Sequence, residues 1–499
     1  MNKKKGIIIA AVIAVVLAAA LVVLLVVPKG GSDDKDKGID HGTDMELSTD
    51  KDGLHQAKVV TDKDGNIPNN SYGTLMEYYP ANIHNIHVEN TSGAFDVVMD
   101  TPEGEATVYK IKGFEDFNLQ SGNPDLIASA AAKLSFTKVA TLDKDKGKEF
   151  GFDKPRSTVT VSYTDNTKAI IIVGNDAPKQ AGTYIRFGTG DAVYVADTET
   201  VKAFDYSIND LISLTVNGTA DNTENNEASS ITLSGAGFPK EVELVPNTNT
   251  NYSASYQMTA PVKRLANENE SSLVTGGIRG LYATSVKLVN PSDKQLAELG
   301  LDKPNAKLTA VYPDTKVELI ATKPDSEGNV LLMADGKKVV YVVSADKVPW
   351  SKTSYEKLCG EYVCCPKLTA LTGVTVKADG KSYEFKLSSH ESVTTDDKGN
   401  ETSATVTTVT YGDKEIEIGK FSDFFNKIAL IGLADAKTDN GGSKEALAVT
   451  YTFEDDSSDT VQFFETGDKY GAKLNGEVAG YSNKGDITRA VKGVAEVIK

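Results

Sequence analysis

Histidine, cysteine and tryptophan are scarce in this chain of 499 residues, which contains five His, three Cys and one Trp. So small a supply leaves few ligands for transition-metal clusters, which are built mainly from Cys and His. Basic residues are also in deficit: 53 Lys and Arg stand against 70 Asp and Glu, for a formal net charge of −17. Because binding to phosphate backbones needs a net basic face, this balance argues against nucleic acid as a partner.

Motifs of known catalytic chemistry are also missing. The sequence contains no GxSxG elbow, P-loop or GxGxxG fingerprint, and no SxxK motif accompanied by its partner motifs. His84 and His87 form an HxxH pair, but residues three apart on a strand point to opposite faces and would not share a metal ion. The stretches 62–66 and 396–400 resemble calcium loops only faintly, because no Glu stands at the twelfth position. We therefore expect no catalytic residue, no bound metal and no cofactor.

One long apolar run is present. Residues 6–27 read GIIIAAVIAVVLAAALVVLLVV, and 22 residues of helix are long enough to span a hydrocarbon core of about 30 Å. Lys3, Lys4 and Lys5 precede the run, so the positive-inside rule places the N-terminus in the cytoplasm. The run exceeds the usual apolar core of a cleaved signal peptide. We therefore expect a cytoplasmic tail over 1–5, a transmembrane helix over 6–27 and a single-pass cell-membrane protein with its bulk outside the cell.

Residues 28–80 follow this run. Gly, Asp, Lys and Ser dominate their first part, and no apolar periodicity appears there. Such a composition is typical of a solvated linker. The sequence predicts an extracellular tether over this range.

Internal repetition is the most informative feature of the remaining chain. Residues 151–167 read GFDKPRSTVTVSYTDNT and residues 300–316 read GLDKPNAKLTAVYPDTK, with seven of 17 positions identical at an offset of 149. Alternating apolar residues after each motif predict half-buried strands, separated by short turns. Short turns between consecutive strands predict antiparallel meanders. The predicted meander strands are 158–163, 169–173, 183–187 and 193–196 in the first copy, and 307–312, 317–320, 330–333 and 339–343 in the second.

A third, divergent copy lacks the GxDKP motif but keeps the alternation through Leu447, Val449, Tyr451 and Phe453. Each copy also has two leading strands, and helix-like stretches precede the meanders at 124–140, 271–284 and 421–431. The sequence thus predicts an α+β fold: three tandem repeats of an antiparallel β-meander flanked by helices, after one N-terminal transmembrane helix. The expected repeat domains cover 81–216, 229–366 and 372–499, with a linker over 217–228.

The GxDKP residues have a structural interpretation that needs no ligand. Gly151 and Gly300 can adopt φ > 0 and end the preceding helix. Asp153 and Asp302 can close the turn through their side chains. Pro155 and Pro304 favour extended backbone and so begin the next strand, which runs to Tyr163 in one copy and Tyr312 in the other. Ligand binding by the motif is the alternative, and we favour the structural role.

The two motifs, each inside a helix–GxDxP–strand–turn–strand context, resemble the bacterial DUF4340 domain proteins. The similarity includes Val159, Val161, Gly174 and Tyr184, covers residues 80–365 well and covers 372–499 loosely. The resemblance implies a membrane-anchored surface protein of unknown biochemical role. It also implies a link to accessory components of ABC-type transporters of the gliding-motility kind, and it brings no catalytic residues.

The three cysteines lie in CGEYVCCP. Outside the cell, Cys359 could pair with Cys364 or Cys365, and a disulfide is then as good an interpretation as three free thiols. Trp350, the one tryptophan, is expected to be a packing anchor. The stretch containing Gly276 and Gly277 fits close packing better than phosphate binding.

Repetition favours a role through contact, since copies multiply surface while one active site gains little from them. We expect a non-enzymatic extracellular repeat protein that serves as a binding scaffold or as an accessory subunit of a cell-envelope complex, for which an ABC-type transporter is one candidate. Two alternatives are kept. A cell-envelope hydrolase acting on wall polymers would need one deep pocket of clustered acids or His. A solute-binding component of a transporter would show a cleft between two copies.

Overall fold

The structure is a computed structural model that describes residues 42–100, 106–221, 223–334, 336, 338–395, 401–437 and 442–499. The expected cytoplasmic tail over 1–5, the transmembrane helix over 6–27 and residues 28–41 of the tether lie outside these ranges. No helix within the described ranges is both long and apolar enough to cross a membrane.

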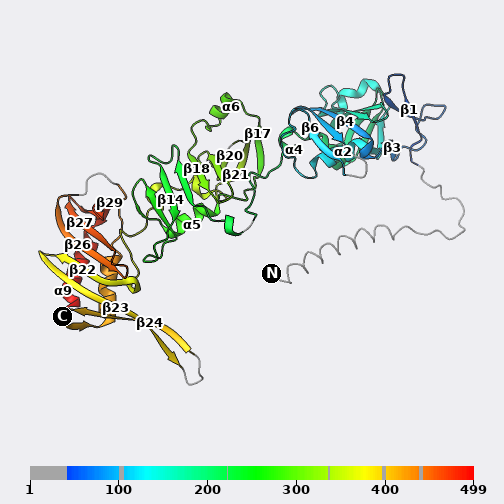
Figure 1. Cartoon of the computed structure of the whole chain (residues 1–499). Helices are drawn as coiled ribbons and strands as arrows, with labels where there is room; N and C mark the ends of the chain where they lie inside the picture. Colours follow the sequence, from blue (N-terminus) through cyan, green and yellow to red (C-terminus); the bar gives the residue numbers. More distant parts are fainter. Residues whose placement is uncertain are drawn as a thin grey trace.

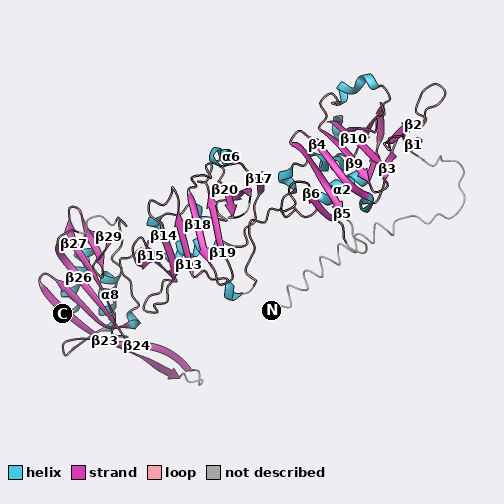
Figure 2. Cartoon of the chain, turned by 45° about the horizontal axis from the view of Figure 1, so that its top comes forward, coloured by secondary structure: helices cyan, strands magenta, loops and turns pink. Residues whose placement is uncertain are grey.

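Three lobes follow one another in a row, each built on one large sheet that is antiparallel throughout (Figure 1). Helices lie against the sheets, so the predicted α+β class is confirmed (Figure 2). Each lobe has its own cluster of buried apolar side chains, and the second and third clusters each include a few residues from the neighbouring lobe. The lobes are therefore separate cores joined by shared packing.

The first lobe contains an eight-stranded sheet of order β6-β5-β4-β9-β10-β11-β12-β8. A second, small sheet pairs β3 with β7, and a third pairs β1 with β2. The strands are β1 Met45–Thr49, β2 His55–Val59, β3 Gly73–Glu77, β4 Ile83–Asn90, β5 Gly93–Asp100, β6 Val108–Ile111, β7 Lys133–Phe136, β8 Lys138–Thr141, β9 Ser157–Tyr163, β10 Lys168–Asp176, β11 Thr183–Phe187 and β12 Val193–Ala196.

The second lobe contains a nine-stranded sheet of order β16-β15-β14-β13-β18-β19-β20-β21-β17. Its strands are β13 Ser230–Ser234, β14 Val242–Pro246, β15 Tyr256–Ala260, β16 Arg264–Leu265, β17 Ser285–Val289, β18 Ala306–Val311, β19 Lys316–Ala321, β20 Asn329–Ala334 and β21 Val339–Ser344.

The third lobe contains an eight-stranded sheet of order β25-β24-β23-β22-β26-β27-β28-β29. Its strands are β22 Leu371–Ala378, β23 Lys381–Thr395, β24 Glu401–Tyr411, β25 Lys414–Ile416, β26 Lys444–Phe453, β27 Ser458–Thr466, β28 Lys469–Leu474 and β29 Glu477–Asn483.

The strand orders share one path. In each lobe the leading strands run outward from the first of them, and that first strand pairs antiparallel with the first strand of a four-stranded meander: β4 with β9, β13 with β18 and β22 with β26. The fourth meander strand pairs with a strand from before the motif in two lobes, β12 with β8 and β21 with β17. In the third lobe the only pairing described at this edge is a single bridge between Asp435 and Tyr481.

The α-helices are short in the first two lobes and longer in the third. α8 and α9 both bury an apolar face, which includes Phe421 and Phe424 on α8 and Val494 on α9. The α-helices are α2 Asn123–Ala132, α3 Thr198–Val201, α4 Ile208–Leu211, α5 Glu268–Gly276, α6 Asp293–Glu298, α7 Tyr355–Leu358, α8 Ile418–Ala429 and α9 Lys484–Val497. Short 3₁₀ helices used below are η2 Lys144–Phe150, η4 Lys202–Asp205 and η6 Pro349–Ser351.

Three predicted elements need correction. The helix expected over 271–284 is α5, which ends at Gly276. The helix expected over 124–140 ends at Ala132, and β7 and β8 follow, because the apolar spacing changes to an alternating one at Leu134 and Phe136. The tether expected over 28–80 is wrong from residue 43 onward. β1, β2 and β3 lie there, and they bury Val59, Leu75 and Met76 in the core of the first lobe.

Candidate functional site

Both GxDKP motifs end a short helix in the same way. Gly151 follows η2 and Gly300 follows α6, and each has a positive φ, 88° and 73°. The next backbone amide donates to the carbonyl five residues back, Phe152 to Gly147 at 3.0 Å and Leu301 to Leu296 at 2.9 Å. This is the Schellman arrangement, which favours glycine at the left-handed position. The role predicted for the two glycines is therefore confirmed.

The acidic residues of the motifs behave differently from the prediction. Asp153 and Asp302 are exposed, and neither side chain has a hydrogen-bond partner among the described residues. The turns close through backbone bonds instead, such as Lys154 N–H to Gly151 O at 3.3 Å. Pro155 and Pro304 stand two residues before β9 and β18, as expected for residues that begin a strand.

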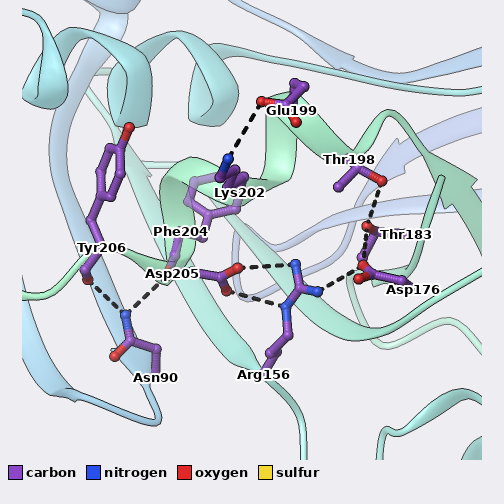
Figure 3. Close-up of polar contacts among 10 residues, drawn as sticks. All are labelled: Asn90, Arg156, Asp176, Thr183, Thr198, Glu199, Lys202, Phe204, Asp205 and Tyr206. Carbon is purple, nitrogen blue, oxygen red and sulfur yellow. Dashed lines mark hydrogen bonds and ion pairs between the residues drawn. The ribbon is translucent and has the colours of Figure 1, made fainter. Parts of the chain in front are cut away.

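The residue after each motif carries the tertiary contact. Figure 3 shows Arg156 between two carboxylates: Nη1 lies 2.7 Å from Asp176 Oδ1, and Nη2 lies 3.0 Å from Asp205 Oδ2. Asp176 ends β10 and Asp205 ends η4, so one guanidinium joins the meander to the helical turn behind it. In the second lobe Asn305 has this place, and its Nδ2 donates to Ser351 O of η6 at 3.0 Å.

The carboxylates around Arg156 differ in their environment. The Thr183 hydroxyl and then Arg156 lower the pKa of Asp176. Burial raises the pKa of Asp205, although Arg156 acts in the opposite direction. Asn90 Nδ2 donates to Phe204 O at 3.0 Å and to Tyr206 O at 2.8 Å, so the same turn is also fixed from β4 (Figure 3). The residues of this cluster are one another's hydrogen-bond and ion-pair partners, which fits a structural clamp.

This geometry separates Asp153 from Arg156. We expect Asp153→Ala to change the free energy of unfolding of the first lobe by less than about 0.5 kcal/mol, because the side chain has no partner. Arg156→Ala leaves the half-buried Asp205 without its cation and should cost about 1–3 kcal/mol. Hydrogen-exchange protection of β9 and β10 measures both effects. Equal loss in the two variants would contradict the assignment.

The tyrosines at the ends of β9 and β18 each hold the chain segment that enters their lobe. The Tyr163 ring stacks on Tyr78 with centroids 4.1 Å apart, and its hydroxyl lies 3.1 Å from Met76 Sδ. Tyr312 lies under Arg279, whose guanidinium carbon is 4.8 Å from the ring centroid. Arg279 in turn donates to the backbone oxygens of Asn225 and Thr219 and pairs with Asp314.

The third lobe repeats this pattern with a residue from outside. Phe453 ends β26, and its ring faces that of Tyr252, which comes from the loop between β14 and β15 of the second lobe. The Tyr252 hydroxyl donates to Asp459 Oδ2 and lies 3.3 Å from Cys364 Sγ. Tyr252 is 8% exposed and belongs to the core of the third lobe. It therefore fastens the second lobe to the third.

His55 makes the N-terminal contact sensitive to pH. Its Nε2 lies 2.9 Å from both the Tyr78 hydroxyl and Thr167 Oγ1, and its Nδ1 lies 3.2 Å from Thr49 Oγ1. Burial lowers the pKa of His55, with Asp165 acting in the opposite direction. A lowered pKa means that the neutral form favours the folded state, so this contribution is present above the unfolded pKa of about 6.5 and is lost as pH falls through the folded value.

We therefore expect β1 and β2 to exchange amide hydrogens faster relative to β9 at pH 5 than at pH 7.5. The measurement is hydrogen exchange by mass spectrometry, corrected for the intrinsic pH dependence of exchange. His55→Gln should remove most of the difference between the two pH values, whereas His84→Gln, at an exposed position, should leave it unchanged. A pH effect of equal size in the His55 variant would refute the role of this residue.

The first and second lobes meet along the segment after α4. Thr215 and Tyr282 form an antiparallel bridge, and Ala283 N–H donates to Leu214 O at 2.8 Å. The Gln120 side chain accepts from Leu214 N–H at 3.2 Å and lies 3.4 Å from the Tyr282 hydroxyl. A cavity of about 320 Å³ lies beside this junction, lined by residues that include Phe117, Asn290 and Tyr341.

The second and third lobes enclose a larger cavity of about 490 Å³. Its lining is mixed, with Tyr252, Arg264 and Lys263 from the second lobe and Asp459 and Asn475 from the third. Arg264 is buried and donates to Ala479 O of β29 and to Cys359 Sγ. Its guanidinium therefore ties β16 to the third lobe beside the Tyr252 contact.

All three cysteines are free thiols, so a disulfide between Cys359 and Cys364 is not formed. The two buried sulfurs face different partners, Arg264 for Cys359 and Tyr252 for Cys364. Burial raises the pKa of Cys359, and it raises the pKa of Cys364 to about 12. Both thiols are protonated at neutral pH and behave as packing residues.

Other candidate residues are not gathered into a site. His87 pairs with Asp96 across β4 and β5 at 3.1 Å, whereas His84 is exposed. Asp62 closes a turn by accepting from the backbone of Asp64 and Asn66. The stretch 396–400 lies outside the described residues. Among the residues that are described, no group of three or more His, Cys, Asp or Glu could hold a metal ion.

Sequence reasoning missed Arg156, Tyr252 and Arg264. Arg156 directly follows the first motif, but the second copy has Asn305 at this position. A comparison of the two copies therefore does not single out Arg156. Tyr252 stands alone in the polar stretch NTNTNYSAS, and a single aromatic residue in such a loop was the available signal.

Comparison with known families gives one match. Residues 110–286 match the family model described as "Domain of unknown function (DUF4340)". No curated protein and no solved structure matches the chain. The predicted resemblance is thereby confirmed over the second half of the first lobe and the first half of the second.

Proposed function

From a chain that carries a DUF4340 domain over residues 110–286, we propose a membrane-anchored extracellular repeat protein without catalytic activity. It acts as a binding scaffold or accessory subunit of a cell-envelope complex, for which an ABC-type transporter is the leading partner. The apolar run over 6–27 is its membrane anchor, with the N-terminus in the cytoplasm.

The repeat hypothesis rests on correspondences between the lobes. The three sheets follow one strand path, the two GxDKP motifs end helices in the same way, and Arg156 and Asn305 contact equivalent helical turns. Tyr163, Tyr312 and Phe453 stand at the same point of the meander and hold the incoming chain. Three related units in series are what this proposal requires.

One observation carries the scaffold role: both junctions are fastened by specific contacts rather than joined by free linkers. Backbone bonds and Gln120 join the first two lobes, and Tyr252 with Arg264 joins the last two. Fixed lobes in a row give length and surface at a set distance from the anchor. A free linker would be expected to let the lobes reorient.

Crosslinking in intact cells followed by mass spectrometry tests the proposal. We expect transporter or other envelope subunits among the products, at residues of the three lobes. Protease added outside intact cells should also remove the lobes and leave residues 1–27 protected. Protection of the lobes themselves, or crosslinks to cytoplasmic proteins only, would overturn the proposal.

The cavity between the second and third lobes favours one second candidate, solute binding. Its volume of about 490 Å³ is within the usual range for small-molecule sites, and polar groups converge on it. Native mass spectrometry of the full chain purified from its own cells would show a bound small molecule. Lys263→Ala and Gln257→Ala, which alter the lining, should lower its occupancy. An empty cavity in every preparation would rule this candidate out.

A further inference from the structure

A long hairpin projects from the third lobe. β23 and β24 pair without interruption from Phe385 and Tyr411 to Thr395 and Glu401. We call residues 388–395 of β23 and 401–408 of β24 the arm. Figures 1 and 2 show it extending away from the body of the lobe.

The arm extends beyond the strands that flank β23 and β24. β22 pairs with β23 only up to Lys386, and β25 pairs with β24 only from Val409 onward. Along the arm, neither strand has a second neighbour among the described residues. A lone two-stranded hairpin is at best marginally stable in water, so an arm of this length gains from a further strand.

The arm has few of the devices that usually protect sheet edges, and its only acidic residues are Glu391 and Glu401. Ten of its 16 residues are Ser or Thr, and it contains no Lys, Arg or Pro. Its pairing has no bulge, although nine other strand pairs among the described residues have register irregularities. Val393 and Val406 are 57% and 41% exposed. Natural proteins block free edges with charges, Pro or bulges, and an edge without them is a template for strand addition.

The sequence of β24 indicates what the added strand is. Residues 402–408 read TSATVTT, which is symmetric in residue type about Thr405. In an antiparallel pair of two such strands, Thr402 stands opposite Thr408, and Ser403 opposite Thr407. Ala404 stands opposite Val406, so hydroxyl meets hydroxyl and apolar meets apolar.

β23 does not have this symmetry. A two-fold axis at Glu391 sets two carboxylates opposite each other, and an axis at Ser392 sets Glu391 opposite Val393. Like charges directly opposite are destabilising in a sheet. The chain as a whole carries a net charge of −17, yet residues 402–408 contain no charged side chain. Two copies therefore meet with least repulsion at the β24 edge.

We infer that the free edge of β24 pairs antiparallel with the same edge of a second copy, across a two-fold axis at Thr405. The two arms then form one four-stranded sheet of order β23-β24-β24-β23. A symmetric contact of this kind closes on itself and gives a dimer rather than a fibre.

Thr405→Lys tests this arrangement without harming the hairpin. Within its own chain, position 405 stands opposite Glu391, so the new Lys gains a cross-strand partner. Across the two-fold axis, however, it faces a second Lys. We expect the full chain in detergent micelles to sediment as a dimer, and the variant to dimerise at least about ten-fold more weakly.

Two controls make the result specific. His390→Lys adds the same charge on the exposed β23 side of the arm and should leave the dimer unchanged. Mixing T405K and T405E chains should restore dimers that neither forms alone. A monomeric wild-type chain, or a T405K chain that dimerises as strongly as the wild type, would overturn the inference. Failure here leaves the scaffold proposal standing, because crosslinking to envelope subunits does not depend on the arm.

Discussion

Replacing Tyr252 with alanine is expected to destabilise the third lobe by about 3–5 kcal/mol, the usual cost of deleting a buried aromatic side chain. The ring lies in the core of that lobe against Phe453, with centroids 6.0 Å apart. The truncation leaves a cavity and removes one donor from Asp459. Because Tyr252 belongs by sequence to the second lobe, the effect crosses a junction between lobes.

The single tryptophan makes this prediction easy to read. Trp350 lies in the second lobe, so its fluorescence reports that lobe, whereas far-UV circular dichroism reports all three sheets. In urea, the variant should show an early dichroism transition from the third lobe while the fluorescence midpoint changes little. A common shift of both signals would mean that the two lobes unfold as one unit.

Tyr252→Phe is the matched control, because it keeps the ring and removes only the hydroxyl. Asp459 still accepts from Asn475 Nδ2 at 2.7 Å, so the expected cost is smaller, about 1–3 kcal/mol. An alanine variant no worse than the phenylalanine variant would show that the ring does not fasten the lobes.

The strands of the meanders could be predicted because their apolar residues alternate. Val159, Val161 and Tyr163 are all buried on one face of β9, and the predicted bounds of β11 and β12 agree with the structure. The alternation records burial on one side of a sheet, which is a local property of the sequence.

The N-terminal strands could not be predicted in the same way. β1 is exposed except at Met45, and β2 is buried only at Ala57 and Val59, so neither shows a full apolar face. Their position depends on pairing with each other and on contacts of His55 with Thr167, far along the chain. Such contacts leave no periodic signal.

The clamp and the junctions were hidden for the same physical reason. Arg156 meets Asp205 and Tyr252 meets Asp459 across 49 and 207 residues, and a single sequence does not tell which carboxylate a cation or hydroxyl will reach. The role of Asp153 was misread because turn propensity suggests a side-chain bond, whereas backbone bonds already close that turn.

Trp350→Ala should have a comparably large effect on the second lobe, again about 3–5 kcal/mol. The side chain is fully buried, and its Nε1 donates to Gly277 O at 2.7 Å. It also sits in η6, whose Ser351 O accepts from Asn305, so its loss weakens the link between the GxDKP motif and the end of the lobe. Urea unfolding followed by dichroism measures the loss, since the fluorophore is gone.

Gly277→Ala probes the same contact while keeping the fluorophore. A Cβ at position 277 would lie 2.5 Å from Pro349 Cδ and 3.0 Å from Lys347 O, too close for either atom, so the turn carrying Trp350 must shift. We expect a lower urea midpoint and an emission maximum shifted to longer wavelength as Trp350 gains solvent. Gly276→Ala is the control, because nothing lies within 4 Å of the added carbon. Equal behaviour of the two glycine variants would show that the approach of Gly277 to η6 does not position Trp350.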